Sequence, residues 1–139
     1  MIEAEIVMTS SNAELVRSYL SALNQLKQGD ELAAYFHPDV VQTEFPNKIT
    51  PERVDRDIAA ILDGAARGAK ILQKQEFTIN NIVEGEESLV AELIWRGTMS
   101  VPVASLKVGD EMVAHFACIF EFKDGLIFRQ RNYDCFEAF

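Results

Sequence analysis

The sequence has 139 residues, 48% hydrophobic and 25% charged, which predicts one globular domain over residues 1–139. Its 22 acidic and 13 basic side chains give a formal net charge of −9, the wrong sign for phosphates, so we expect no nucleic-acid partner. No apolar run approaches the roughly 20 residues that span a bilayer. The N-terminus lacks the pattern of a signal peptide. We therefore expect no membrane segment and a cytoplasmic location.

The first predicted element is a helix over residues 11–28. Ser11 and Glu14 have the spacing of a capping box, which satisfies free N–H groups at a helix start. The apolar side chains that then recur with helical period are Leu15, Val16, Tyr19, Leu20, Leu23 and Leu26. Gly29 ends the pattern. Tyr19 is a candidate ligand contact on this apolar face.

Two further helices and a strand are expected before residue 70. Asp30 can cap a short helix over 30–35, and residues 40–45 have the β-favouring composition of a strand. Proline is tolerated at the first helical position, so Thr50 followed by Pro51 predicts the start of a third helix. That helix is expected to end at Gly68.

From Lys70 onward the hydrophobic period changes to two. The predicted strands are 71–83, 88–99, 111–122 and 126–135, separated by turn signals that include the K-D-G tripeptide. Helices early and hairpin-linked strands late predict an α+β fold with helices packed on a curved antiparallel sheet. For residues 1–9, a flexible arm and an addition to a sheet edge both remain open.

The last hairpin permits two registers. If Asp124 and Gly125 form a two-residue turn, His115 faces Asp134 and the pair resembles a catalytic dyad. If Gly125 is instead a bulge after a type I turn, Cys118 pairs with Gln130 and the dyad disappears. A shift of one residue moves every side chain to the other face, so the register determines which residues form a site.

We favour the bulged register because it separates an apolar face from a charged one. The apolar face then carries Ala114, Phe116, Cys118, Phe120, Phe122, Phe128, Gln130, Asn132 and Asp134. The charged face carries His115, Glu121, Arg129, Arg131 and Tyr133, and it suits solvent or a second subunit. An apolar wall with polar groups at one end is typical of a ligand pocket.

Two carboxylates are candidates for acid/base catalysis. Asp134 lies near the end of the apolar face, where loss of hydration raises a carboxyl pKa. Glu44 is either a pocket base or an exposed strand residue. Trp95 is either a pocket wall whose indole N–H binds ligand or a core residue. If Gln130 and Asn132 are buried, they must hydrogen-bond to each other, to water or to ligand.

Three stretches of the sequence resemble a known family. They are G-D-E-L-A-A-Y-F-H-P-D-V-V, A-E-L-I-W-R-G-T and V-G-D-E-M-V-A-H-F-A-C-I-F-E-F-K-D-G-L-I-F-R-Q-R-N-Y-D. The pattern is similar to the nuclear transport factor 2-like superfamily, in particular its SnoaL-like branch with polyketide cyclases and ketosteroid isomerases. The resemblance implies a cystatin-like cone of sheet around the first helix, and a homodimer formed through the outer sheet face. One such fold hosts many chemistries.

The resemblance can be tested at individual positions. The isomerase base falls on Glu44 or on Phe45, depending on the direction of counting, and the oxyanion acid of the isomerases falls on Cys118. Their helix tyrosine falls near Ala22, so steroid isomerisation is disfavoured. The histidine of the polyketide cyclases falls on Gln130, which cannot exchange a proton near neutral pH.

The sequence therefore supports two hypotheses. The first is a cofactor-free isomerase, cyclase or hydrolase that uses Asp134 or Glu44 on a small hydrophobic molecule. The predicted pocket wall is Phe116, Phe120, Phe128 and Trp95, together with Cys118. The second is a non-catalytic ligand-binding or dimeric interaction module. No metal site is expected, since His37 and His115 lack ligand spacing to other residues.

Overall fold

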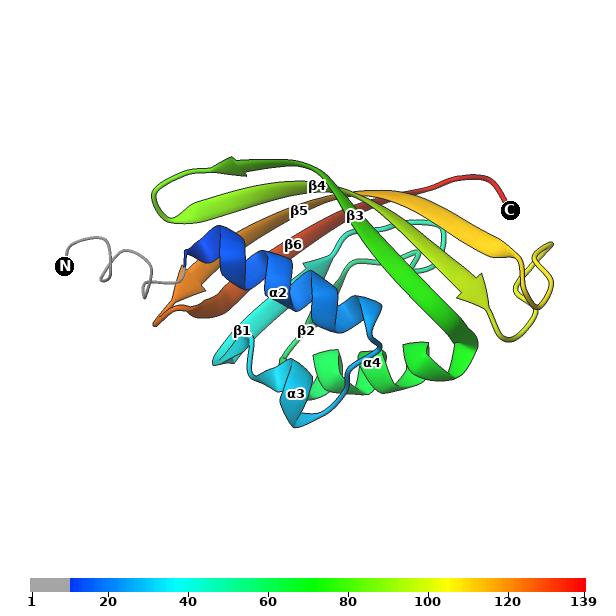
Figure 1. Ribbon diagram of the computed structural model, residues 1–139, viewed down its shortest axis with the longest axis horizontal. Helices are drawn as coiled ribbons and strands as arrows, with labels where there is room; N and C mark the ends of the chain where they lie inside the picture. Colours follow the sequence, from blue (N-terminus) through cyan, green and yellow to red (C-terminus); the bar gives the residue numbers. More distant parts are fainter. Residues whose placement is uncertain (1–10) are drawn as a thin grey trace.

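The computed structural model describes residues 11–139; the prediction for residues 1–9 lies outside this range. A sheet of six strands in the order β2-β1-β6-β5-β4-β3 curves around the helices, which lie on its concave side (Figure 1). All neighbouring strands are antiparallel except β1 and β6, which are parallel. The predicted α+β class, with helices on a curved and mostly antiparallel sheet, is confirmed. Within residues 11–139, no helix combines the length and apolar character needed to cross a bilayer.

The first two helices agree with the sequence prediction in place, although both are shorter. Helix α2 is Asn12–Asn24, and the hydroxyl of its N-cap Ser11 accepts a hydrogen bond from the Glu14 backbone N–H at 3.0 Å. Helix α3 is Asp30–Ala33. The predicted start of α2 is thus confirmed by its cap.

The strands after residue 70 follow the alternation of apolar and polar residues. They are β3 (Leu72–Glu84), β4 (Ser88–Met99), β5 (Glu111–Lys123) and β6 (Leu126–Phe136). Each bound lies within one residue of its prediction. Strand β1 (Phe36–Glu44) begins earlier than predicted and contains a register shift between Phe36 and Val41, around Pro38. Proline within a strand is typical of such irregularities.

Helix α4 (Ile58–Ile71) begins later than the predicted start at Thr50 and Pro51, which is therefore wrong. The Asn47 side-chain oxygen accepts hydrogen bonds from the N–H groups of Ile49, at 2.9 Å, and Thr50, at 3.0 Å. The Asn47 N–H donates to the Thr50 carbonyl at 2.8 Å. This closed turn places Pro51 outside any helix.

The residues between that turn and α4 form a short strand that the sequence did not predict. Strand β2 (Val54–Arg56) pairs with β1 and places Arg56 opposite Gln42. The carboxylate of Asp57 then caps α4 by accepting a hydrogen bond from the Ala60 N–H at 2.9 Å. Arg56 thus lies on a sheet edge and not inside a helix.

This cap can be tested by mutation. Asp57→Ala is expected to lower the free energy of unfolding by about 1 kcal/mol, because it removes the acceptor for a free N–H at the start of α4. Urea denaturation would measure the change. Thr50→Ala, at the position predicted from the sequence, is the control. A larger loss in the control than in Asp57→Ala would contradict the assigned helix start.

The turn between β5 and β6 has two residues. Asp124 and Gly125 have positive φ angles of 54° and 75°, and Phe122 lies opposite Ile127. Two consecutive residues with positive φ are typical of the type I′ turns that join antiparallel strands. At the turn itself the favoured bulged register is therefore wrong.

A bulge follows the turn in β6, after the paired residues Leu126 and Ile127. The pairing shifts by one at Phe128, so Cys118 lies opposite Asn132 and not opposite the predicted Gln130. Both predicted registers are wrong beyond this point. As in the bulged register, however, even-numbered residues of β5 lie opposite even-numbered residues of β6. Gln130 and Asn132 therefore share one face of the sheet with the even-numbered residues of β5.

The main core lies between the concave sheet face and the helices. Its fully buried members include Val16 of α2, Leu32 of α3, and Leu89, Phe120 and Ile127 of the sheet. A second cluster, at the other end of the sheet, is formed by Leu72, Met99 and Met112, with Trp95 and Phe136 packed against it.

Candidate functional site

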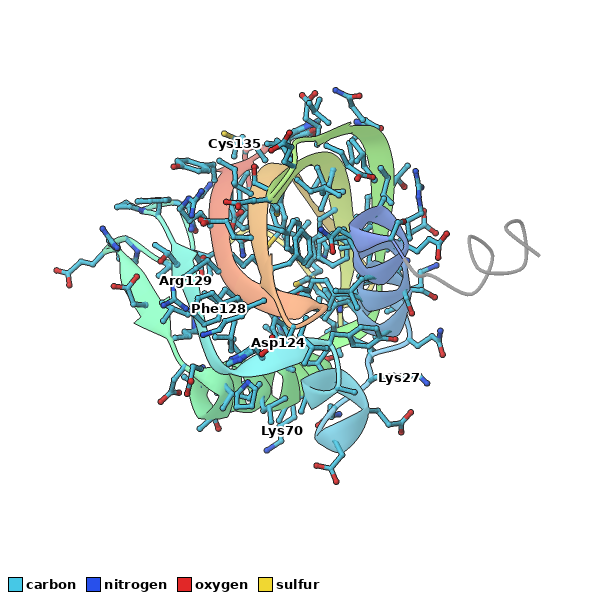
Figure 2. All side chains as sticks on the ribbon, turned by 90° about the vertical axis from the view of Figure 1, so that its left-hand side faces the viewer. Lys27, Lys70, Asp124, Phe128, Arg129 and Cys135 are labelled. Carbon is cyan, nitrogen blue, oxygen red and sulfur yellow. The ribbon has the colours of Figure 1, made fainter. Side chains whose placement is uncertain are left out.

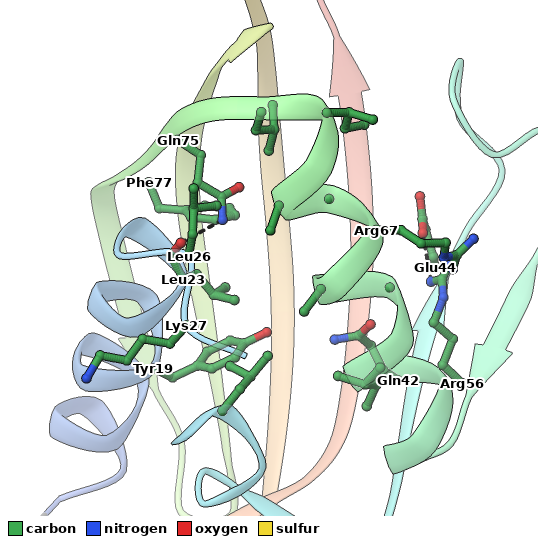
Figure 3. Close-up of a pocket in the computed structure, with 18 of the residues that line it drawn as sticks. Tyr19, Leu23, Leu26, Lys27, Gln42, Glu44, Arg56, Arg67, Gln75 and Phe77 are labelled. Atoms are coloured by element: carbon green, nitrogen blue, oxygen red, sulfur yellow. Dashed lines mark hydrogen bonds and ion pairs between the residues drawn. The ribbon is translucent and has the colours of Figure 1, made fainter. Parts of the chain in front are cut away.

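A cavity of about 580 Å³ opens on the concave side of the sheet. Side chains from α2 and α4 and from strands β1, β2 and β3 line it (Figure 3). Its size lies within the range of small-molecule sites. The two helices thus hold a space over the sheet that the core residues do not fill.

One wall of the cavity is aromatic and aliphatic. Tyr19 and Leu23 of α2 and Phe77 of β3 line it, and the hydroxyl of Tyr19 points into the space (Figure 3). The Tyr19 side chain is only 4% exposed. Burial raises its pKa well above the ordinary value for tyrosine, although the nearby amides of Gln130 and Gln42 partly oppose this. Tyr19 is therefore a neutral hydrogen-bonding group.

The opposite end of the cavity is polar. Gln42 and Glu44 of β1 and Arg56 of β2 line it (Figure 3). Arg56 Nη1 donates to Glu44 Oε1 at 2.8 Å, and Asn47 Nδ2 donates to Glu44 Oε2 at 2.7 Å. The sequence left open which face of β1 carries Glu44, and in the structure its side chain lines the cavity. The hydroxyl of its neighbour Thr43 instead donates a hydrogen bond to Asp55.

A second carboxylate lies close to this polar end. Asp134 is on β6, and its Oδ1 atom is buried without a hydrogen-bond partner among residues 11–139. Burial, together with a smaller effect of the Glu44 carboxylate, raises the pKa of Asp134 to about 7, and the Arg56 guanidinium opposes this shift. Asp134 is not among the residues that line the cavity, whereas Glu44 and Arg56 are.

Polar side chains on β1 and β6 connect into a chain of hydrogen bonds. Gln42 Nε2 donates to Gln130 Oε1 at 3.1 Å, and Gln130 Nε2 donates to Asn132 Oδ1 at 3.1 Å. Gln130 is 3% exposed, so these bonds offset the cost of burying its amide. Of this chain only Gln42 lines the cavity.

Most of the predicted pocket wall lies elsewhere. Trp95 stacks on Phe116 with ring centroids 6.2 Å apart, and its indole N–H donates to Gln75 Oε1 at 2.9 Å. Gln75 lines the cavity, whereas Trp95 and Phe116 do not. Phe120 and Cys118 are 0% and 3% exposed members of the main core. Their prediction as ligand contacts is corrected, because α2 covers this part of the sheet.

Phe128 is also misplaced by the prediction. At the bulge its ring lies against Arg129 and His37, outside both core clusters, with the Arg129 guanidinium 3.9 Å from the ring centre (Figure 2). The extra residue in β6 rotates this side chain away from the cavity.

His115 takes no part in the site. It lies opposite Cys135 on the charged face, and its Nε2 is 2.8 Å from Glu137 Oε2. Asp134 lies opposite Phe116 on the other face, so no His115–Asp134 dyad forms. Within residues 11–139, no group of three or more metal-ligating side chains occurs.

Sequence reasoning missed Arg56 and the inner face of α4. The small residues Gly64, Ala65, Gly68 and Ala69 line the cavity, and their weak apolar pattern gave no signal of a binding wall. The sequence did not indicate Arg56 as a site residue, because its segment is predicted to be part of a helix. The alternation in V-D-R before a capping Asp57 was the available signal.

The sequence of this chain matches a known protein family. Residues 16–130 match the family model of the SnoaL-like domain. Comparison with curated protein sequences gives no match.

Solved structures show the same fold. IdmH from Streptomyces antibioticus has 18% identity and a TM-score of 0.74, covering 90% of this chain and 92% of its own. A SnoaL-like polyketide cyclase from Agrobacterium tumefaciens has 17% identity and a TM-score of 0.68, with 91% and 92% covered. A protein of ketosteroid isomerase-like fold from Catenulispora acidiphila has 14% identity and a TM-score of 0.67, with 88% and 86% covered. At these identities the likeness concerns the fold. The family match extends over most of the sequence, and the chain therefore belongs to the SnoaL-like domain family.

Proposed function

We propose that this protein binds a small, largely hydrophobic carbonyl compound in the cavity and moves a proton on it with the carboxylates of Glu44 and Asp134. The observation that carries the proposal is the pair itself. Glu44 lines the cavity, and Asp134, with a buried and unpartnered oxygen among the described residues, has a pKa of about 7. A general acid or base works best when its pKa lies near the working pH.

The two carboxylates would have different roles. Glu44, at the cavity surface, would contact the ligand next to its oxygen or its acidic carbon. Asp134 would exchange a proton with the groups at the polar end of the cavity. Its neutral carboxyl can donate a hydrogen bond and its ionised form can accept one. Arg56 would limit the build-up of negative charge when both carboxylates are ionised. General acid/base catalysis of this kind can serve isomerisation, cyclisation and hydrolysis.

One observation favours a second candidate function, non-catalytic binding. Both Glu44 oxygens already have partners, Arg56 at 2.8 Å and Asn47 at 2.7 Å. A carboxylate held in this way serves as a structural wall as readily as a base. The two functions differ in whether the bound molecule exchanges protons.

Proton exchange can be measured without knowing the natural substrate. Hydrophobic methyl ketones, including 2-acetylnaphthalene, would be screened by thermal shift. Deuterium incorporation at their α-carbon in D₂O would then be followed by NMR. We expect wild type to bind and to catalyse exchange, and Asp134→Asn to lose about 100-fold or more of the exchange rate, as for a removed general acid/base.

Asp39→Asn is the matched control, since it makes the same change at an exposed carboxylate of β1. Its exchange rate should equal that of wild type. Binding without exchange in wild type would support the non-catalytic function. Equal exchange in wild type and Asp134→Asn would refute the role of Asp134.

A further inference from the structure

The side chain of Asn47 connects the Glu44 carboxylate to the turn that follows β1. Its Nδ2 group donates to Glu44 Oε2 at 2.7 Å and to the Phe45 carbonyl at 2.9 Å. Its Oδ1 atom accepts from the N–H groups of Ile49, at 2.9 Å, and Thr50, at 3.0 Å. The reverse orientation of the amide would bring oxygen against oxygen and N–H against N–H. The NH₂ end of Asn47 is therefore fixed toward Glu44.

The turn requires the oxygen of this side chain but not its NH₂ group. Asparagine, aspartate and serine side chains all close such turns by accepting hydrogen bonds from N–H groups further along the chain. Of these three, asparagine alone carries an amide NH₂, which can only donate. The short contact with Glu44 is thus a part of the Asn47 geometry that the turn does not explain.

Glu44 is held from two sides. Arg56 Nη1 donates to its Oε1 atom at 2.8 Å, so each carboxylate oxygen has a donor, one from β2 and one from the turn. The last torsion angle of a glutamate side chain is otherwise broad. Two donors on different segments remove this freedom. Glu44, whose side chain is 15% exposed, therefore keeps one orientation beside the cavity that it lines.

We propose that Asn47 is a positioning residue whose amide NH₂ group sets the orientation of the Glu44 carboxylate toward a molecule bound in the cavity. The inference rests on the proposed function, in which Glu44 contacts the ligand. Asn47 is not among the residues that line the cavity, so it acts through Glu44. Without the amide, the carboxylate could rotate about its remaining bond to Arg56. A misaligned reacting group costs rate more than binding, because alignment matters most in the transition state.

The test uses substitutions that keep an acceptor for the turn and remove the donor to Glu44. These are Asn47→Ser and, as a second variant, Asn47→Asp. Deuterium exchange into 2-acetylnaphthalene would be followed at several ketone concentrations, which separates the exchange rate at saturation from KM. Asn81→Ser is the matched control, because Asn81 Nδ2 also donates to a glutamate, Glu92, at 3.0 Å, on an exposed part of the sheet outside the cavity.

Both Asn47 variants should lower the saturated exchange rate by about 10-fold or more, with KM changed by less than about 2-fold. Asn81→Ser should exchange at the wild-type rate. In a Glu44→Gln background, Asn47→Ser should change the remaining exchange by less than about 2-fold. The loss of Tm caused by Asn47→Ser should also fall by about half there, because a hydrogen bond to a carboxylate is about twice as strong as one to a neutral oxygen.

The outcomes separate this inference from the proposed function. Wild-type exchange that neither Asn47 variant alters would overturn the inference alone. An equal loss of rate or of Tm from Asn47→Ser with and without Glu44→Gln would also overturn it, because Asn47 would then act through the turn. A raised KM with an unchanged saturated rate would do the same. A wild type that does not exchange the ketone would remove the proposed function, and the inference with it.

Discussion

Relative to wild type, Asp134→Asn is expected to be more stable at pH 8 than it is at pH 5. Burial raises the pKa of this carboxyl from the ordinary 3.8 to about 7, so the folded state binds the proton more tightly than the unfolded state. The difference corresponds to about 4 kcal/mol. Asparagine is neutral at every pH and does not incur this cost.

The direction of the pH dependence follows from the raised value. The protonated carboxyl contributes its full stability below pH 3.8, and this contribution is lost as the pH rises through about 7. About 3 kcal/mol of the loss falls between pH 5 and pH 8. Over that interval, the unfolding free energy of Asp134→Asn should rise by this amount relative to wild type.

Urea denaturation at pH 5 and pH 8 would measure the effect, with the exposed Asp39→Asn as the control. Comparing the two pH values removes the fixed cost of placing an amide at this site. If wild type and Asp134→Asn differed equally at both pH values, Asp134 would not be a buried, protonated carboxyl.

Gly97→Ala is expected to destabilise the protein by about 2 to 3 kcal/mol, the cost of overpacking a core. A Cβ atom at this buried position of β4 would lie 2.5 Å from Trp95 Cζ2 and 2.9 Å from Leu72 Cδ2. The indole cannot move freely, because it stacks on Phe116 and donates to Gln75. The added methyl group would therefore break the packing of Trp95.

The same substitution in a Trp95→Leu background provides the control. The ring atoms that the methyl group would meet are then absent, so the added cost of Gly97→Ala should fall below about 1 kcal/mol. Trp95 is the one tryptophan of the sequence, so its fluorescence reports directly on this site. An unchanged emission spectrum and unchanged unfolding free energy in Gly97→Ala would show that the contact is absent.

The last four strands could be predicted to within one residue, because alternation and turn residues are local signals. The start of α4 could not. Thr50 and Pro51 have the residue types of a helix start, but the Asn47 side chain closes a turn around them. Local propensity was overridden by hydrogen bonds that the pattern does not reveal.

The candidate site was predictable only in part. Glu44 and Tyr19 do line the cavity, and Asp134 has the raised pKa expected of a carboxyl on an apolar face. The aromatic wall was placed wrongly because strand patterns show which side chains turn inward, but not which of them a helix then covers. Phe120 turns inward and is core.

The hairpin combines two irregularities that compensate each other. The two-residue turn alone would put His115 opposite Asp134, and the extra residue at Phe128 restores the opposite assignment of faces. The bulge, and not the turn, therefore determines which face of the sheet Asp134 occupies. Phe128 is the residue that the bulge accommodates, so deleting it would remove the bulge and leave Glu121 opposite Arg129 and Phe116 opposite Asp134. The bulge in β6, as much as the composition of the strand, keeps the ionisable carboxyl of Asp134 on the side of the sheet that faces the cavity.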